Sequence, residues 1–461
     1  MPPSGTSGPS SESHPASESH PASESRPASE SRPASESHPA FGQLTHYAGF
    51  DWGKYEHQIA VVDRAGQLVL ELRFEDTAAG WAALREQLAT CPRLGVAIET
   101  CCGPAVERLL DAGLSVYPLN PKAAQRYRDR KAPSGGKSDR LDARSFADAL
   151  RTDGHGWRIL QPQDPLTQEL RLLCRDEIGL IAQRTALVNH LQDALHEYYP
   201  TALQAFDDWT APAAWAFVVA FPTPPALARA GRRRWEKFLH THKLYRPQTA
   251  GERLERFTHA LEFVSPSAAV TSAKSFLAVA LAKQLRLLEN QLNEYRQRIA
   301  QLFADHPDHD VFGSLPGAGE KLAPRLLAEL GSNRAEFASP QALQCYAGAA
   351  PVSCQSGRTR RVHLRRACNH WLRATVHLWA NQSRKWCAWA QAYYLHKKAQ
   401  GKAHAAALRC LGQRWLKILW RLWQDGVPYD EALHLRNQIA HGSWVIALVP
   451  PRASDSKPCR G

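Results

Sequence analysis

The sequence predicts a mixed α/β domain near the N-terminus and a mainly helical chain after it. Two observations lead to this prediction. Between residues 45 and 160, short apolar runs first follow one another directly and then alternate with stretches of helical spacing. In the longer stretches beyond residue 160, apolar side chains recur every three or four positions, as in amphipathic helices. A chain of 461 residues with 44% hydrophobic residues can bury two or three cores, so we expect several domains.

The first apolar runs predict three strands joined in a meander. They cover residues 47–53, 58–62 and 67–74, with a turn at 63–66. Helical spacing and apolar runs then alternate, which indicates a parallel section of the sheet. The helices of this section cover 77–89 and 103–110, and its strands cover 94–98 and 114–119. A meander followed by alternating helices and strands is the order of the ribonuclease H-like fold.

Four acidic residues stand where this fold would bring them together. Asp51 lies at the end of the first predicted strand and Glu99 at the end of the fourth, so adjacent pairing would set them side by side. Asp139 and Asp142 are three residues apart at the start of a predicted helix that runs to about residue 150, and this spacing puts them on one helical face. Carboxylate oxygens suit Mg²⁺, and two such ions can clamp both oxygens of a phosphodiester exchange. We therefore predict a magnesium site.

Two other interpretations of these residues stay open. Ser138 is a candidate N-cap, and acids in a first helical turn suit the helix dipole, so the second pair could simply be capping. Sugar kinases and actin-like ATPases also begin with a Gly-x-Asp-x-Gly turn, as at Gly49, Asp51 and Gly53. They need a second glycine-rich phosphate turn with its own Asp, and the glycines at 317–319 have no acid at the required place.

The charge of the chain favours a polyanionic partner. There are 57 Lys and Arg residues against 44 Asp and Glu, and residues 351–461 alone hold 19 basic and 4 acidic side chains. We therefore expect nucleic-acid affinity at the C-terminal end. The ten cysteines show no zinc spacing, and we expect neither a signal peptide nor a segment long enough to span a bilayer. These features predict a cytoplasmic protein.

Three further segments carry predictions of their own. Residues 11–40 are five copies of SESHPA or SESRPA, a composition typical of a disordered tail, which we extend over residues 1–44. The predicted helix at 167–198 places Arg171 and Arg175 on polar positions, where they would face either solvent or phosphate. The leucine seam, an apolar heptad pattern from 281 to 302, predicts a coiled coil between subunits, with packing inside the monomer as the alternative.

The C-terminal part contains a glycine-rich turn and an unusual serine. The turn at 315–319, before a predicted helix at 321–330, resembles a helix-hairpin-helix hairpin and would let backbone N–H groups approach phosphate. Ser356 beside Gly357 would expose a hydroxyl among arginines, and such a hydroxyl is a nucleophile only when cations or metals absorb the developing charge. Capping or phosphate contact is the alternative. Seven Trp between residues 371 and 423 indicate a helical core more than a base-stacking surface.

Taken together, these segments resemble a known family. GFDWGK, AIET, KSDRLDARSFA, LPGAGEKLAPRLLAELG, YAGAAPVSCQSG and NHWLR occur in this order between about residues 47 and 423. They resemble the motifs of the DEDD insertion-sequence transposases of the IS110 family. Two departures stand out: Cys368 replaces the glycine usual before the asparagine of NHWLR, and residues 206–266, with Arg232-Arg233-Arg234, match nothing in the family pattern.

The resemblance implies a domain order and a set of site residues. It implies a RuvC-like DEDD domain at 45–160, a helical linker with a coiled coil at 161–310, a serine transposase domain at 311–430 and a tail at 431–461. It places Mg²⁺ on Asp51, Glu99, Asp139 and Asp142 and makes Ser356 the nucleophile that forms a 5′-phosphoserine link to DNA. It further implies active sites shared between subunits of a dimer or tetramer, and a bridge RNA that pairs with donor and target DNA.

We therefore expect a transposase that cuts and rejoins donor and target DNA. Arg358, Arg361 and Arg365 would neutralise nearby phosphates, an expectation based on their closeness to Ser356 in the sequence. One rival is a RuvC-like structure-selective nuclease that uses the same carboxylates with metal-activated water. Another is a non-catalytic nucleic-acid-binding relative.

Overall fold

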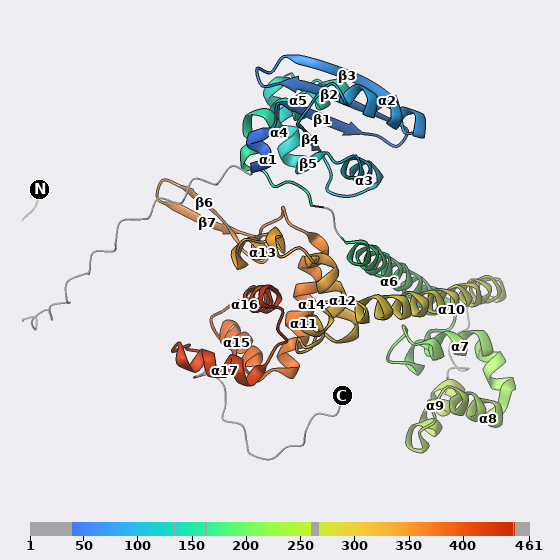
Figure 1. The fold of residues 1–461 in the computed structure, drawn as a ribbon. Coiled ribbons are helices and arrows are strands. Elements are labelled where there is room, and N and C mark those ends of the chain that lie inside the picture. The colour runs from blue at the N-terminus through green and yellow to red at the C-terminus, as the bar shows by residue number, and fades with distance from the viewer. Residues whose placement is uncertain (1–38, 133, 162–163, 260–266, 446, 448–461) are drawn as a thin grey trace, which may run out of the picture. The chain divides into compact units, whose positions relative to one another are not determined.

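The computed structural model describes residues 39–132, 134–161, 164–259, 267–445 and 447. The predicted repeat tail lies outside the described residues up to residue 38. Residues 39–43, which we expected to be part of that tail, form the short helix α1 (Pro39–Gln43). The centre of the Phe41 ring lies 5.8 Å from that of Tyr47 and 6.0 Å from that of Tyr117. These contacts with the folded domain explain why α1 forms. The chain divides into two compact units, one within residues 1–162 and one within 163–461 (Figure 1).

The N-terminal unit contains the predicted mixed sheet. Its five strands lie in the order β3-β2-β1-β4-β5, with an antiparallel meander followed by parallel pairing of β1 with β4 and of β4 with β5. This mixed α/β arrangement agrees with a ribonuclease H-like domain. The strands are β1 (His46–Trp52), β2 (Glu56–Asp63), β3 (Leu68–Glu75), β4 (Leu94–Ile98) and β5 (Ser115–Pro118).

Helices cover both faces of this sheet. One face packs against α2 (Ala78–Leu88) and α3 (Pro104–Asp111) through a core that includes Phe50 and Trp81. The other packs against α4 (Pro121–Lys131) and α5 (Asp139–Asp153) through a core that includes Phe146. The helix α4 was not expected from the sequence, although an N-cap asparagine followed by proline marks its start.

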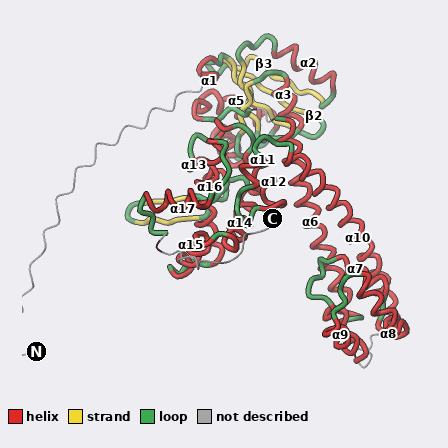
Figure 2. Tube along the Cα trace, turned by 60° about the horizontal axis from the view of Figure 1, so that its bottom comes forward, coloured by secondary structure: helices red, strands yellow, loops and turns green. Residues whose placement is uncertain are grey.

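Two long helices organise the second unit. The helices α6 (Pro165–Tyr198) and α10 (Ala268–Ala304) run antiparallel, because Glu169 near the start of α6 pairs with Arg298 and Glu197 near its end pairs with Lys274 (Figure 2). The leucine seam lies buried inside this chain, and Leu285 is fully buried. The prediction of a coiled coil between subunits is therefore wrong for this seam, because α6 of the same chain covers it.

The segment that matched nothing in the family pattern is a helical insertion between α6 and α10. It contains α7 (Pro212–Ala220), α8 (Pro224–Thr241) and α9 (Pro247–His259), and the short helix η2 (Pro200–Ala205) precedes it; residues 260–266 lie outside the described residues. Each of the three α-helices has proline as its first residue, a position where the backbone N–H that proline lacks would have no partner within the helix. Its buried aromatic rings, Trp215 and Phe217 of α7 and Trp235 of α8 among them, lie in a core that it shares with α6 and α10.

The remaining elements form the C-terminal half of the second unit. Four of the seven tryptophans noted in the sequence are fully buried, namely Trp379, Trp389, Trp415 and Trp423, so they belong to the core. The elements are α11 (His309–Gly313), α12 (Gly319–Leu330), η4 (Arg334–Glu336), α13 (Pro340–Tyr346), β6 (Val352–Ser356), β7 (Thr359–His363), α14 (His370–Trp386), α15 (Ala388–Ala399), α16 (His404–Asp425) and α17 (Glu431–Ala440). Throughout the described part of the chain, no helix combines the length and apolar character needed to cross a membrane.

Candidate functional site

Two of the four predicted carboxylates lie beside each other at the end of the sheet. Asp51 is the penultimate residue of β1, and Glu99 directly follows β4. The parallel register pairs Phe50 with Ile98, so the two acids occupy the next position along neighbouring strands. Side chains alternate along a strand, and Asp51 therefore points to the same face as Gly49, which is the face covered by α5.

The other two carboxylates are brought to this face by α5. Ser138 caps the helix, and its hydroxyl accepts a hydrogen bond from the Leu141 N–H at 3.2 Å. The predicted cap is therefore present. Asp139 is exposed in the first turn, whereas Asp142 is buried to 2% exposure against the sheet.

Gly49 allows α5 to approach β1 closely. A Cβ at this position would overlap the carbonyl oxygen of Ala143 and would lie 2.7 Å from the Cβ of Phe146. Both contacts are too short for real atoms, so any side chain would push α5 away from the strand. The absence of a side chain at Gly49 thus sets how near the α5 carboxylates lie to Asp51.

Electrostatic repulsion couples the four carboxylates. The pKa of Asp51 is raised from 3.8 to about 6, first by burial and then by the negative charges of Asp142, Asp139 and Glu99. Burial also raises the pKa of Glu99, and the charge of Asp142 adds to this effect. Lys137 lowers both pKa values but does not offset the repulsion. The fold therefore concentrates negative charge at one place in the N-terminal unit.

Arg128 of α4 is a site residue that our sequence analysis missed. Its Nε donates a hydrogen bond to Oδ1 of Asp142, and both side chains are largely buried. Its positive charge also partly offsets the rise that burial causes in the pKa of Glu99. The signal for it was the Asn120-Pro121 helix start, since the helix that begins there carries Arg128 toward the carboxylates.

The four carboxylates supply the negatively charged oxygen ligands that a divalent metal prefers. Their side chains, however, do not converge on one point in this structure. Among the residues that the structure describes, no three His, Cys, Asp or Glu side chains are close enough together to hold an ion. One reason is that Asp142 is engaged by Arg128. Burial and the neighbouring negative charges nevertheless raise the pKa of Asp51, and a divalent cation bound through hard oxygen ligands would offset that repulsion.

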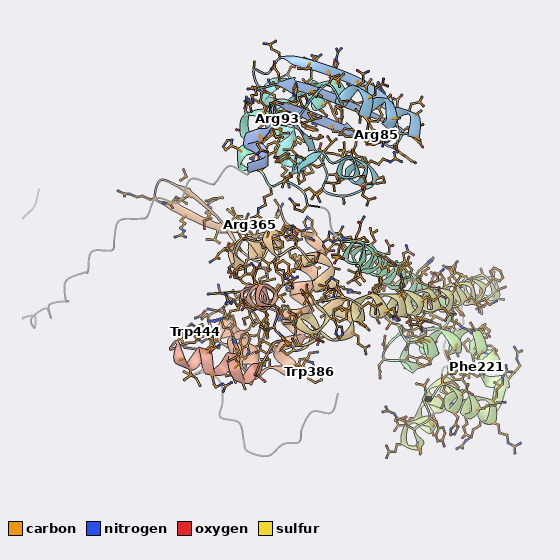
Figure 3. All side chains as sticks on the ribbon, viewed as in Figure 1. Arg85, Arg93, Phe221, Arg365, Trp386 and Trp444 are labelled. Carbon is orange, nitrogen blue, oxygen red and sulfur yellow. The ribbon has the colours of Figure 1, made fainter. Side chains whose placement is uncertain are left out.

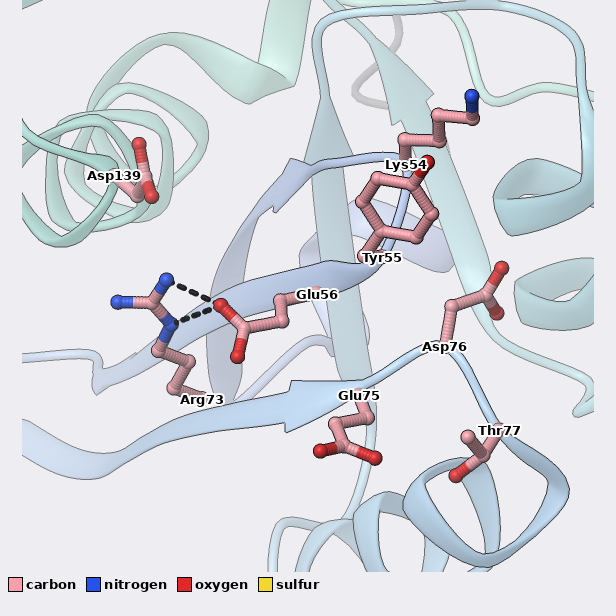
Figure 4. A pocket seen from close by; sticks show the side chains of 8 residues that line it. All are labelled: Lys54, Tyr55, Glu56, Arg73, Glu75, Asp76, Thr77 and Asp139. Carbon is pink, nitrogen blue, oxygen red and sulfur yellow. Dashed lines mark hydrogen bonds and ion pairs between the residues drawn. The ribbon is translucent and has the colours of Figure 1, made fainter.

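A cavity of about 680 Å³ opens beside Asp139 (Figure 4). It lies between the turn that joins β1 to β2 and the end of β3. Its lining residues are Lys54, Tyr55, Glu56, Arg73, Glu75, Asp76, Thr77 and Asp139.

The predicted nucleophile lies in the second unit, on the β6–β7 hairpin. Ser356 is the last residue of β6 and pairs with Thr359, and a two-residue turn between them begins at Gly357, which has φ 54°. The turn needs a residue that tolerates a left-handed backbone, and glycine does so without strain. The Ser356 side chain is exposed, and residues 351–369 contain no acidic side chain.

The hairpin register decides which cations share a face with Ser356. Residues directly opposite each other, and those two apart along a strand, lie on the same face. Arg361 pairs with Cys354 and therefore lies on the face of Ser356, whereas Arg360 pairs with Gln355 on the other face. Arg358 lies in the turn. Arg365, labelled in Figure 3, lies beyond the hairpin. It donates from Nε to the Ala350 carbonyl at 3.3 Å, which leaves it partly engaged by the backbone.

Comparison with known proteins places both candidate regions in transposase families. A family model described as Transposase matches residues 48–200, which contain all four carboxylates. A second, described as Transposase IS116/IS110/IS902 family, matches residues 309–395, which contain Ser356.

Relatives match most of the chain. A Streptomyces coelicolor protein, provisionally named the mini-circle transposase for IS117, is 34% identical over 84% of this chain and 96% of its own length. The chain belongs to the IS110 family of transposases. The uncharacterized 42 kDa protein of insertion element IS900 from Mycobacterium paratuberculosis is 28% identical over 84% of this chain and 97% of its own length. The uncharacterized 43.6 kDa protein of IS110 from Streptomyces coelicolor is 27% identical over 84% and 96%.

In this IS110-family chain, Asn369 anchors the end of the serine hairpin. Its side-chain N–H groups donate to Glu329 at 2.6 Å and to the Tyr346 hydroxyl at 2.9 Å, while its side-chain oxygen caps α14 by accepting from Leu372 at 3.0 Å. The departure from the family pattern at Cys368 is accommodated next to it. Gly348 has φ 64° and no Cβ, and the sulfur of Cys368 occupies the space that this Cβ would need.

Arg171 and Arg175, two predicted phosphate contacts, have structural partners instead. Arg175 forms a two-pronged ion pair with Glu329 at 2.8 and 2.9 Å, and Arg171 donates to the Ala328 carbonyl at 2.6 Å. Both residues therefore join α6 to α12, and we do not include them in the proposed nucleic-acid surface.

The glycine-rich turn at 315–319 also has a packing reason. A Cβ on Gly317 would lie 2.8 Å from the backbone of Gln382 and Ser383 in α14, and Trp379 of the same helix donates to the Pro316 carbonyl at 3.1 Å. The turn joins two helices, as predicted, but Gly317 lies against α14. Close packing thus accounts for this glycine without a phosphate contact.

Proposed function

We propose that this transposase cuts and rejoins DNA at a magnesium-dependent carboxylate centre, with the Ser356 hydroxyl as the attacking group. The single observation that carries the proposal is the burial of Asp51 beside Asp142, Asp139 and Glu99, which together raise its pKa to about 6. Family membership supports DNA as the substrate, since the matching family models describe transposases.

The four carboxylates would hold the metal. Divalent metal held there would polarise the scissile phosphate and stabilise charge on the attacking and leaving oxygens. The chain's own residues prepare the site: Gly49 admits α5 against β1, and Ser138 fixes the start of α5. Separation of Arg128 from Asp142 would free the Asp142 carboxylate as a ligand and leave a guanidinium near the DNA.

Ser356 would carry out the strand exchange. A bond forms between its Oγ and the phosphorus while the bond from phosphorus to the 3′ oxygen breaks, and the serine proton passes through solvent to that oxygen. The products are a 5′-phosphoserine and a free 3′ hydroxyl. Attack by another 3′ hydroxyl reverses the step, joins the strands and returns the proton to Ser356. One phosphodiester replaces another, so the exchange needs no energy-rich cofactor. Arg361, on the same face, and Arg358, in the turn, would pair with the phosphate.

We further propose that the protein acts as a homo-oligomer, a dimer or tetramer, guided by a structured RNA. The support for this is the family resemblance of the motifs, together with a net charge of +13 that favours polyanions. The test is to express the protein with the non-coding DNA that flanks its reading frame and to digest the purified complex with ribonuclease. Recombination that survives complete digestion would contradict the guided mechanism.

The main experiment looks for protein attached to DNA. Purified protein is incubated with Mg²⁺ and a plasmid that carries the ends of its element, then denatured, and the DNA is examined for covalently bound protein. We expect an adduct with the wild type and none with Ser356→Ala. Ser353→Ala is the matched control, because Ser353 lies on the same strand but on the opposite face, and it should keep the adduct.

Three outcomes would contradict the proposal. An adduct formed by Ser356→Ala would exclude this serine as the attachment point. Cleavage by the wild type without any adduct would favour the rival nuclease, in which metal-activated water attacks the phosphate. Asp139→Asn should abolish cleavage in both cases, so full activity of that variant would exclude the carboxylate centre.

A further inference from the structure

The end of β1 and the turn that joins it to β2 expose aromatic side chains directly after Asp51. Tyr55 is 72% exposed and Trp52 is 49% exposed, and the Nζ of Lys54 lies 5.1 Å from the centre of the Tyr55 ring. Aromatic side chains usually bury most of their surface, as Phe50 does on the preceding strand. This turn therefore presents ring faces to solvent next to the carboxylate centre.

The same turn forms one wall of the 680 Å³ cavity (Figure 4). Tyr55 and Lys54 lie on one side of this space, and Asp139 of α5 lies on another. The cavity thus borders a member of the carboxylate quartet. Its volume falls within the range of about 300–1,000 Å³ that is typical of small-ligand sites.

Most polar groups of the cavity already have partners. Arg73 donates to Glu56 at 2.9 Å, and Asp76 accepts from the Trp81 ring nitrogen at 2.7 Å. Thr77 caps α2. Among the residues that the structure describes, the Glu75 and Asp139 carboxylates form no ion pair or hydrogen bond with a side chain, and the Lys54 ammonium lies over the Tyr55 ring.

We propose that this cavity receives an unpaired nucleobase of the DNA strand held at the carboxylate centre, an inference that rests on the proposed function. The base stacks on Tyr55, its exocyclic amino group donates to Glu75, and Lys54 meets an adjoining phosphate at the rim. A base within a duplex is covered on both faces, so only an unpaired base can stack in this way. Adenine, cytosine and guanine carry the amino group that Glu75 would accept, and thymine does not.

The charge of the lining favours a base over a phosphate inside the cavity. Four carboxylates, Glu56, Glu75, Asp76 and Asp139, face two cations, Lys54 and Arg73. A free nucleotide would bring several phosphate charges into this acidic space and be repelled. A neutral base avoids this repulsion, and its flat ring can stack on the exposed ring of Tyr55, the aromatic residue of the lining.

The test measures binding in metal-free buffer with EDTA, so that no cleavage occurs. The probe is a duplex oligonucleotide with a single bulged 2-aminopurine, compared with the same duplex fully paired. Wild type should bind the bulged probe more tightly and quench its fluorescence by stacking. Tyr55→Ala should lower affinity for the bulged probe by about five- to 150-fold, the range expected for loss of one base stack. Tyr55→Phe keeps the ring and should behave as wild type.

Trp386→Ala is the matched control, because Trp386 is 70% exposed and lies in the other unit (Figure 3). It should leave both affinities unchanged. The proposal is overturned if Tyr55→Ala keeps the preference for the bulged probe, or if Trp386→Ala loses it equally. Since the Tyr55 side chain is mostly exposed, Tyr55→Ala should unfold at the wild-type temperature, which a thermal melt verifies.

Glu75 is tested with a second probe in which purine, lacking the amino group, replaces 2-aminopurine. Wild type should prefer 2-aminopurine, and Glu75→Ala should bind both probes equally. Equal binding of the two probes by wild type would overturn the assignment of Glu75. A failure of the proposed function can be told apart from a failure of the base-binding proposal. The Asp51→Asn variant should lose recombination but should still bind the bulged probe and quench its fluorescence.

Discussion

At Gly49 the absence of a side chain decides how close α5 lies to the sheet. The ideal Cβ position there is already occupied by the backbone of α5, with Ala147 N 2.5 Å away. The glycine therefore has a structural reason in the packing of α5 on β1. Since α5 carries Asp139 and Asp142, the same contact also determines the charge density around Asp51.

Gly49→Ala should destabilise the N-terminal unit. Overpacking costs about 1–3 kcal/mol where neighbours can shift, and here the neighbour is helix backbone, so the upper part of this range is expected. Urea unfolding followed by circular dichroism measures the effect. Gly42→Ala is the control, because a Cβ at Gly42 meets no atom within 4 Å. Equal stability of the two variants would contradict the close approach.

The titration of Asp51 links stability to pH. Its pKa in the folded protein is about 6, above the ordinary value of 3.8. Between these two pH values the folded protein binds more protons than the unfolded chain, so the free energy of unfolding falls as pH rises through this range. Metal binding should have the opposite dependence, because a proton on Asp51 competes with Mg²⁺ for the same oxygens.

Asp51→Asn should therefore stabilise the metal-free protein at pH 7, and the gain over wild type should shrink as pH falls toward 5. Thermal melts of both proteins in EDTA at several pH values measure this difference. In wild type the additional stabilisation by Mg²⁺ should be larger at pH 7.5 than at pH 5.5, and it should be absent in Asp51→Asn. A variant that is less stable than wild type at pH 7 would show that repulsion at this site is not the controlling effect.

Among the elements, the β6–β7 hairpin depends on its root. Its strands are exposed, with only Val352 half-buried, so little packing holds the hairpin itself. The fixed point is Asn369, which joins Glu329 of α12, Tyr346 of α13 and the start of α14. Positioning of Ser356 should therefore depend on this side chain.

Asn369→Ala should lower the free energy of unfolding by about 2–4 kcal/mol, since it removes an N-cap and a hydrogen bond to a carboxylate. It should also reduce the yield of the protein–DNA adduct. Ser339→Ala, which removes only the cap of α13, should cost about 1 kcal/mol and leave the adduct yield unchanged. Chemical denaturation and the adduct assay together separate the two effects. Similar adduct yields in the two variants would exclude the positioning role.

The α6–α10 pair makes a separate prediction about the leucine seam. Leu285 is fully buried in the core shared with α6, whereas Leu287 is 62% exposed. Leu285→Ala should cost about 2–5 kcal/mol, while Leu287→Ala should have little effect on stability. Because the seam is used inside the chain, neither variant should change the oligomeric state measured by sedimentation velocity. A monomeric Leu285→Ala from an oligomeric wild type would contradict this.

At the scale of the whole molecule, the division into two units predicts that Mg²⁺ stabilises the N-terminal unit alone. The carboxylates all lie within residues 1–162, and Ser356 lies within 163–461. Hydrogen exchange with and without Mg²⁺ should therefore show added protection in β1, β4 and α5 and none in the serine hairpin when DNA is absent. Protection of the hairpin by Mg²⁺ alone would contradict the assignment of the metal site to residues of the N-terminal unit.

Much of the N-terminal unit could be predicted from local patterns. Apolar runs ending in acids located β1 and β4 within one or two residues, because a buried strand requires continuous apolar residues. The helix α4 and its Arg128 were missed, since α4 buries only Ala124 and thus lacks an apolar stripe. The insertion at 206–266 matched no family motif, although its three proline-initiated helices follow ordinary capping rules.

The amino-acid sequence by itself determined the order of strands and helices, the four acids, the serine and the family, because these depend on residue type and spacing along the chain. Tertiary structure alone decided which partner each group meets. The leucine seam meets α6 of its own chain, Arg175 meets Glu329, and Asp142 meets Arg128. Such pairings join residues far apart in the chain, and their energies depend on distance and burial that no local pattern contains.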